Sequence, residues 1–213
     1  MRHTEQIIAI DGPAGIIETR IASPAEPRGL ALVCHPHPLF GGSNDNKVVH
    51  TLASAFVRLG YVALRPNFRG VGGSGGQHDE GRGESEDMLI VLAEARRIFG
   101  ELPVILAGYS FGAYVQTRVA EALVKSGQPA RRLALVGTAV GAIDSVARTY
   151  AARPVAGDAL IIHGAADTTV PLANVLAWAE PLELPVIVIP GADHFFHRRL
   201  HLIRGIVLRA WQH

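Results

Sequence analysis

Short apolar runs alternate with longer amphipathic stretches along most of this 213-residue chain. From Leu30 onward each run has the length of a β-strand, and the stretch that follows it has the period of a helix. This alternation is typical of βα units, whose strands pair in parallel within one sheet. The apolar runs are Leu30 to Cys34, Tyr61 to Leu64, Val104 to Ala107, Leu133 to Val136, Ala159 to Ile162 and Val186 to Ile189.

Two more strands are predicted ahead of this pattern. The stretches Gln6 to Ile10 and Gly15 to Ala22 flank the turn-forming residues Asp11-Gly12-Pro13-Ala14, which predicts an antiparallel hairpin. We therefore expect a single α/β domain over residues 1–213, with a mostly parallel sheet of about eight strands and helices on both faces. The predicted helices are Lys47 to Leu59, Glu84 to Phe99, Ala113 to Lys125, Leu172 to Ala179 and Phe196 to Trp211.

The charge composition argues against polyanionic partners. The chain has 20 Lys and Arg against 19 Asp and Glu, without a run of five like charges, so neither a nucleic-acid surface nor a polybasic membrane patch is expected. No apolar run approaches the roughly 20 residues that cross a bilayer. One cysteine and the absence of a signal-peptide pattern at the start predict a soluble, cytoplasmic protein.

The most specific local motif is Gly108-Tyr109-Ser110-Phe111-Gly112. It follows a predicted strand and precedes a predicted helix, which is the context that the pattern G-x-S-x-G requires. A sharp turn that strains Ser110 brings neighbouring backbone so close that side chains at Gly108 and Gly112 would clash. The turn is expected to expose the Ser110 hydroxyl at a helix N-terminus, where developing negative charge is favoured.

A serine becomes a good nucleophile only beside a base that an acid orients. Asp167 and His194 each lie just past the carboxyl end of a predicted strand, at the edge where α/β sheets place their sites. The order Ser110, Asp167, His194 along the chain is also the order of nucleophile, acid and base expected with a G-x-S-x-G turn between a strand and a helix. Asp193 and Asp144 remain alternative acids.

These motifs resemble the α/β-hydrolase superfamily over nearly the whole chain. The segments 34–43 (CHPHPLFGGS) and 67–74 (NFRGVGGS) are similar to small bacterial hydrolases related to dienelactone hydrolases and carboxylesterases. The resemblance implies a Ser-Asp-His hydrolase, with those roles on Ser110, Asp167 and His194.

Acyl transfer also needs two N–H donors for the oxyanion. The residue after the nucleophile, Phe111, supplies one, and the loop after the Leu30 to Cys34 strand supplies the other. Because prolines have no N–H, the donor in that loop is His37, Leu39 or Phe40. Resemblance to the dienelactone group favours Leu39. Phe40 and Phe195 are the candidate substrate-binding residues, while Phe196 either joins them or packs the last helix.

Other motifs carry less weight. Gly70 to Gly75 matches G-x-G-x-x-G, but no helix follows, so a loop rather than a dinucleotide site is expected. His35 and His37, or His194, His197 and His201 on one predicted helical face, could be metal ligands, and zinc needs three or four that converge. We expect instead that His35 braces the oxyanion loop and that His197 and His201 lie on the helix surface. Cys34 is expected to be a buried apolar residue. We expect neither a metal nor a cofactor.

The stretch 137–158 is too short to hold the helical cap that many α/β hydrolases insert there. We therefore expect a lidless site, at which water is the acyl acceptor and a small-molecule ester of a short or medium acyl group is the substrate. A thioesterase, lactonase or amidase would use the same triad, and a non-catalytic binding protein remains an alternative. Arg69, Arg148 and Arg153 either bind an acidic substrate or are solvated side chains at the surface.

Overall fold

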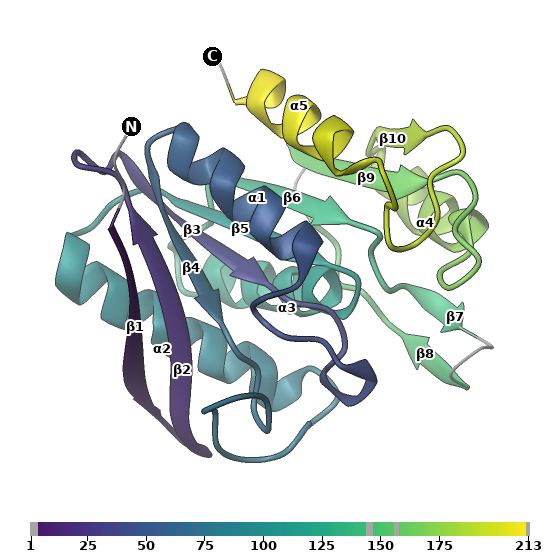
Figure 1. Cartoon of the computed structure of the whole chain (residues 1–213). Helices are drawn as coiled ribbons and strands as arrows, with labels where there is room; N and C mark the ends of the chain where they lie inside the picture. Colours follow the sequence, from purple (N-terminus) through teal and green to yellow (C-terminus); the bar gives the residue numbers. More distant parts are fainter. Residues whose placement is uncertain (1–3, 144–146, 156–157, 212–213) are drawn as a thin grey trace.

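The computed structural model describes residues 4–143, 147–155 and 158–211 (Figure 1). Its strands are β1 (Thr4–Gly12), β2 (Gly15–Ser23), β3 (Gly29–Cys34), β4 (Tyr61–Pro66), β5 (Val104–Tyr109), β6 (Arg132–Val136), β7 (Gly141–Ile143), β8 (Arg148–Tyr150), β9 (Ala159–Gly164) and β10 (Val186–Ile189). Its helices are α1 (Lys47–Arg58), α2 (Arg82–Phe99), α3 (Phe111–Lys125), α4 (Leu172–Ala179) and α5 (Leu200–Ala210), with 3-10 turns η1 (Pro38–Phe40) and η3 (Glu180–Leu182).

Eight of the strands form one sheet in the order β1-β2-β4-β3-β5-β6-β9-β10. β1 and β2 make the predicted antiparallel hairpin, and β2 pairs antiparallel with β4. From β4 to β10 every neighbouring pair is parallel, so these six strands end at the same edge of the sheet (Figure 1). The α/β fold class and the hairpin predicted from the sequence are confirmed.

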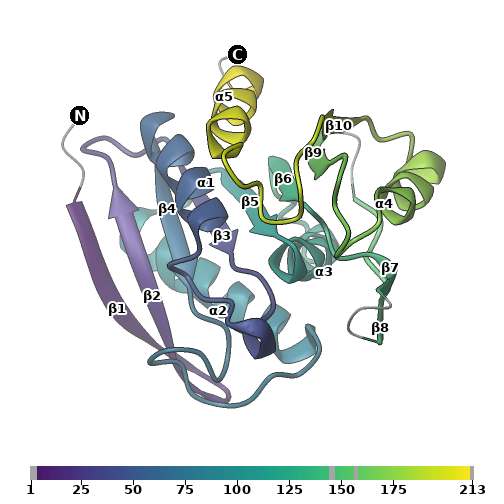
Figure 2. The ribbon, with the colours of Figure 1, turned by 45° about the vertical axis from the view of Figure 1, so that its right-hand side comes forward.

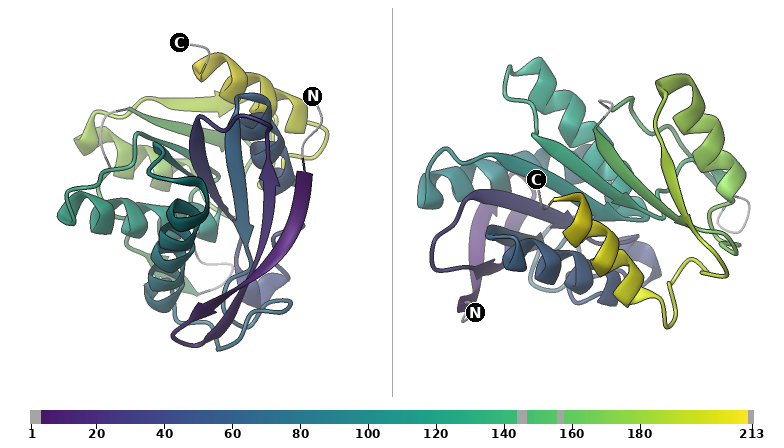
Figure 3. Two further views of the ribbon diagram at one scale, coloured as in Figure 1. Left: turned by 90° about the vertical axis from the view of Figure 1, so that its left-hand side faces the viewer. Right: turned by 90° about the horizontal axis from the view of Figure 1, so that it is seen from above.

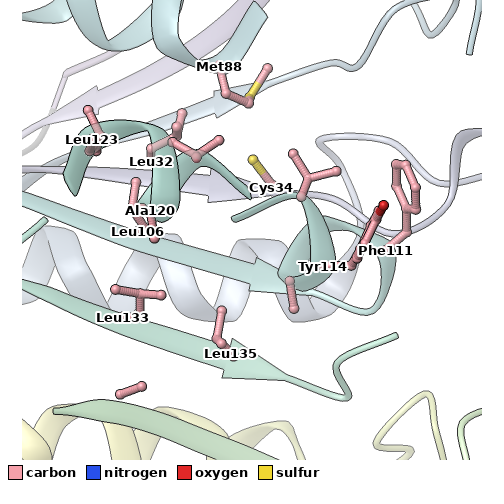
Figure 4. Close-up of a cluster of buried hydrophobic side chains, with 14 of the residues drawn as sticks. Leu32, Cys34, Met88, Leu106, Phe111, Tyr114, Ala120, Leu123, Leu133 and Leu135 are labelled. Carbon is pink, nitrogen blue, oxygen red and sulfur yellow. The ribbon is translucent and has the colours of Figure 1, made fainter. Parts of the chain in front are cut away.

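Helices cover both faces of the sheet (Figure 3). On one face, α1 and α5 pack through residues such as Leu52 and Ile203 against the small side chains of β3, β4 and β5. On the other face, α2, α3 and α4 cover a cluster that includes Leu32 of β3 and Met88 of α2 (Figure 4). Strands covered on both faces are apolar at nearly every position, which explains the near-continuous apolar runs of the central strands.

The last helix begins later than predicted. α5 starts at Leu200 rather than Phe196, whereas the other four helices match their predicted bounds to within two residues. Phe196 and Arg198 have φ values of 52° and 58°, a left-handed conformation that a right-handed helix does not accommodate. His194 and His197 therefore lie in a loop, and the expected helical face of His194, His197 and His201 does not form.

The chain between β6 and β9 contains two short strands. Gly141–Ile143 and Arg148–Tyr150 pair antiparallel as β7 and β8, a small separate sheet near the end of α4 (Figure 2). Over its described residues this region contains no helix that could serve as a cap. The prediction of a lidless architecture is confirmed.

Among the described residues, the helices are too short or too polar to cross a membrane.

Two adjacent phenylalanines provide a test of the packing. Phe196 is fully buried beside Tyr109, while Phe195 is 59% exposed. Phe196→Ala should lower the free energy of unfolding by about 3–5 kcal/mol, because a large cavity opens in the core. Phe195→Ala should change it by less than about 0.5 kcal/mol. Urea unfolding of both variants checks this, and similar losses in the two would contradict the packing described.

Candidate active site

Ser110 occupies a strained turn between β5 and α3. Its φ and ψ are 56° and −118°, outside the regions that residues with a Cβ favour. A Cβ at Gly108 would lie 2.5 Å from the Gly112 backbone, and one at Gly112 would lie 2.4 Å from the carbonyl oxygens of Cys34 and His35. The sequence prediction that both positions require glycine is confirmed by these distances, and the turn presses the start of α3 against the loop after β3.

Three residues from distant parts of the chain converge at this edge of the sheet. His194 Nε2 lies 3.0 Å from Ser110 Oγ, and His194 Nδ1 lies 2.7 Å from Asp167 Oδ2. Asp167 follows β9 and His194 follows β10, and all three side chains are at most 8% exposed. The structure therefore joins the predicted serine, histidine and acid in one chain of hydrogen bonds.

The Asp167 carboxylate is held by its own loop. Its Oδ1 accepts hydrogen bonds from the N–H groups of Thr169 (2.9 Å) and Val170 (2.8 Å), which leaves Oδ2 for His194. Since a carboxylate accepts, the proton of a neutral His194 ring lies on Nδ1. His194 Nε2 is then the acceptor for the Ser110 hydroxyl proton.

His163 is a neighbour of the acid that the sequence analysis did not single out. It is fully buried, its Nε2 lies 3.0 Å from the Val170 carbonyl and 3.4 Å from Asp167 Oδ2, and burial lowers its pKa. The neutral His163 ring therefore packs against Asp167. It also binds the Val170 carbonyl, in the loop whose N–H groups bind the Asp167 carboxylate. The sequence feature that could have identified His163 is its position directly after an apolar run and four residues before Asp167.

Of the two alternative acids, Asp193 is engaged by a residue other than His194. Asp193 accepts hydrogen bonds from the backbone N–H (3.1 Å) and ring Nδ1 (2.5 Å) of His197 instead. Asp144 lies outside the described residues.

The N–H groups of the loop after β3 differ in whether they are hydrogen-bonded. The N–H of Leu39 donates to His37 Nδ1 at 3.2 Å, and the N–H of Phe40 donates to the His37 carbonyl at 3.1 Å. In this structure both N–H groups are therefore engaged within the loop, and the assignment of Leu39 as the second oxyanion donor stays a prediction. Within the described part of the chain, the N–H groups of His37 and Phe111 have no acceptor.

Aromatic rings form one wall of the site. The His37 ring lies 4.7 Å from Phe111 and 4.6 Å from His78, and Phe111 lies 6.1 Å from Tyr150. Burial, helped by the positive charge of nearby Arg148 and by His78, lowers the pKa of His37 to about 3. His78 comes from the glycine-rich loop, residues 70–83, and Tyr150 comes from β8.

The glycine-rich loop is folded onto the protein by a buried acid. Glu84 accepts hydrogen bonds from the backbone N–H groups of Asp79 (2.9 Å) and Gly81 (2.8 Å), and its Oε1 lies 2.8 Å from His78 Nδ1. The segment 70–75 that matches G-x-G-x-x-G lies in the loop that also carries His78, and no helix begins directly after it in the described structure.

The predicted substrate-binding phenylalanines are exposed to solvent, whereas the cysteine is buried. Phe40 and Phe195 are 60% and 59% exposed, and Phe195 lies 5.6 Å from the His194 ring. Cys34 is fully buried, and burial raises the pKa of its thiol well above the usual value, so it is not a nucleophile.

Each arginine considered for an acidic substrate faces a carboxylate. Arg69 binds Asp87 through two hydrogen bonds of 2.8 and 2.9 Å. The remaining two ion pairs are longer, Arg148 to Glu80 at 3.8 Å and Arg153 to Glu121 at 3.5 Å.

Comparison with known proteins identifies the family. A family model described as serine aminopeptidase, S33, matches residues 25–160. The uncharacterized protein RP471 of Rickettsia prowazekii is 36% identical over 200 residues, which cover 89% of this chain and 81% of that protein. The chain belongs to this family of α/β hydrolases.

Two solved structures of α/β serine hydrolases are similar to this chain in both sequence and fold. An α/β serine hydrolase homologue from Coxiella burnetii has a TM-score of 0.81 and 39% identity, with 96% of each chain covered. A serine hydrolase without lid from Xanthomonas campestris has a TM-score of 0.84 and 34% identity, covering 99% of this hydrolase and 94% of that chain. The present hydrolase is likewise lidless.

His35 braces the loop of this hydrolase that carries His37. The N–H of Phe68 donates to His35 Nε2 at 2.9 Å, and His35 Nδ1 donates to the Pro36 carbonyl at 2.7 Å. Both ring nitrogens are therefore engaged with backbone rather than with a metal. Burial lowers the pKa of His35 to about 4.

This pKa makes stability depend on pH. Between about pH 6.5 and 4 the unfolded chain binds a proton at His35 that the folded protein excludes, so the free energy of unfolding falls as the pH falls. His35→Gln should make that slope shallower by up to about 1.4 kcal/mol per pH unit. Urea unfolding at pH 7, 5.5 and 4.5 measures it. His201→Gln, at an exposed position on α5, should keep the wild-type slope, whereas equal slopes in wild type and His35→Gln would contradict this account.

Proposed function

We propose that this protein is a serine hydrolase that cleaves carboxylic esters through an acyl-enzyme. The observation that carries the proposal is the hydrogen-bonded series Ser110–His194–Asp167, with distances of 3.0 and 2.7 Å, on a strained turn. Family membership supports the hydrolase class, and the geometry of this series supports the nucleophile, the base and the orienting acid.

The proposed reaction has two halves. Ser110 Oγ attacks the ester carbonyl as His194 Nε2 takes its proton, and Asp167 stabilises the imidazolium that forms. The tetrahedral intermediate then expels the alcohol, which receives the proton from His194, and leaves the acyl group on Ser110. Water, deprotonated by His194, attacks the acyl-enzyme and releases the acid.

The oxyanion of each tetrahedral intermediate would be bound by the backbone N–H groups of Phe111 and His37. Both are donors without an acceptor in the described structure, and the ring of His37 packs on that of Phe111 at 4.7 Å. His35 and Gly112 hold the two donors close, because the start of α3 presses on the Cys34 and His35 carbonyls. Preorganised donors of this kind lower the barrier for acyl transfer.

Esters fit the site better than peptides with a free amino terminus, the substrates implied by the name serine aminopeptidase. An aminopeptidase binds the substrate ammonium with an acidic group. Here the buried carboxylates are already used, since Asp167 binds His194 and Glu84 binds its own loop. Exposed Phe40 and Phe195 provide apolar contacts for a short or medium acyl ester.

Ser110→Ala should lower kcat for p-nitrophenyl acetate by about 10^4-fold or more, because the nucleophile is lost. Ser126→Ala, at the far end of the same helix, is the matched control and should keep wild-type activity. A fluorophosphonate probe should label wild type and Ser126→Ala, but not Ser110→Ala. Retention of most of the esterase activity by Ser110→Ala would refute the mechanism.

A proline can test the His37 donor. His37 has φ −56°, which proline adopts, so His37→Pro removes the N–H with little change in backbone conformation. Loss of one oxyanion donor should lower kcat about 10^2- to 10^3-fold relative to His37→Ala, which loses the imidazole but keeps the N–H. Circular dichroism checks that both variants fold. Equal kcat values in the two variants would exclude the His37 N–H as a donor.

A further inference from the structure

A groove of about 460 Å³ lies beside His194 on the face of the sheet covered by α1 and α5. It runs between the loop that leads into α1 and the turn that follows His194. Its volume is within the range of small-molecule sites. The lining residues that matter are Tyr109, Lys47, Phe195 and Arg198, with Asp45 and His197 also present.

Two lining residues connect the groove to the proposed catalytic base. The hydroxyl of Tyr109 donates to the His194 carbonyl at 2.8 Å, and the ring of Phe195 lies 5.6 Å from the His194 ring. In ester cleavage, the leaving oxygen must come within hydrogen-bond distance of His194 Nε2 to receive its proton. Phe195, the residue after His194, lines the groove, which makes the groove a candidate site for the alcohol portion of the substrate.

The groove carries uncompensated positive charge. Lys47 and Arg198 are exposed and have no acidic partner among the described residues, in contrast to Arg69, Arg148 and Arg153. The other ionisable side chains of the groove already have partners, Asp45 an ion pair with Arg20 at 3.4 Å and His197 a hydrogen bond with Asp193. The two free cations thus face the same groove from opposite sides.

The backbone that presents Arg198 is held in an unfavourable conformation. Arg198 and Phe196 are both left-handed, with φ of 58° and 52°. The turn persists because Phe196 is buried in the core and because its N–H donates to the Asp193 carbonyl at 3.2 Å, while the Asp193 carboxylate accepts from the His197 N–H. Strain maintained in this way is typical of functional positions.

From these observations we propose that the groove binds an anionic group, a carboxylate or a phosphate, on the leaving alcohol of the ester. Lys47 and Arg198 bind the anion, and the ring of Phe195 contacts the carbon skeleton that joins it to the ester oxygen. This inference rests on the proposed esterase function, and it specifies the class of ester: one with an acidic alcohol portion.

The test compares acetate esters that differ only in the leaving group. 4-Acetoxybenzoate and 4-acetoxyphenyl phosphate place an anion on the leaving phenol, and 4-acetoxybenzamide is the neutral counterpart. We expect kcat/KM to be about tenfold higher for at least one anionic ester than for the amide. Whichever anionic ester is preferred distinguishes a carboxylate from a phosphate as the natural group.

Variants assign the preference to the two cations. Lys47→Gln and Arg198→Gln should each lower the ratio of anionic to neutral kcat/KM about threefold, as suits exposed charge pairs, and the double variant should bring it near one. Arg58→Gln, at the other end of α1 and outside the groove, should leave both activities unchanged. The preference of the wild type should also weaken as salt increases.

A further pair of esters locates the anion. Monophenyl succinate carries its charge on the acyl side, and phenyl butyrate is the neutral match. A stronger charge preference in this pair than in the leaving-group pair would overturn the assignment. So would a wild-type leaving-group ratio near one, or a ratio that the double variant keeps. If neither the amide nor the anionic esters are hydrolysed in a Ser110-dependent way, the proposed function fails instead.

Discussion

The close approach of two backbone segments, at Gly108 and Gly112, is the constraint on which the rest of the site depends. The backbone conformation of Ser110, with φ 56° and ψ −118°, is unfavourable by about 1–3 kcal/mol. It is tolerated because β5 lies in the middle of the sheet with neighbours on both sides. The same contact seats the start of α3 against the Cys34 and His35 carbonyls. One turn therefore determines both where the serine hydroxyl lies and how close the loop after β3 can come to it.

The site also depends on polar groups that are buried around it, most of which make hydrogen bonds. Buried polar groups are costly unless they are paired, and the loops around the site pair them locally. Thr169 and Val170 bind Asp167, Phe68 binds His35, and Glu84 binds the glycine-rich loop. Among the described backbone donors around the site, the N–H groups of His37 and Phe111 are left without an acceptor. In the proposed mechanism they bind the oxyanion.

Much of this arrangement is predictable from the sequence, because it follows from patterns that span several residues. The buried strands read as apolar runs, and the elbow is recognisable from its glycines and its position between a strand and a helix. The start of α5 was mispredicted because Phe196 and Arg198 adopt left-handed conformations without the glycine that usually signals them. The hydrogen bond from the Leu39 N–H to the His37 ring could not be predicted, because it depends on a side-chain conformation that no local sequence pattern indicates.

The most direct measurement of the central claim is the identification of the covalent intermediate. Wild-type protein mixed with p-nitrophenyl acetate is quenched in acid during the first turnover, digested and analysed by peptide mass spectrometry. The account predicts one acetyl group, on Ser110, formed at least as fast as steady-state turnover. Acetylation of another residue, or turnover without any covalent acetyl group, would contradict it.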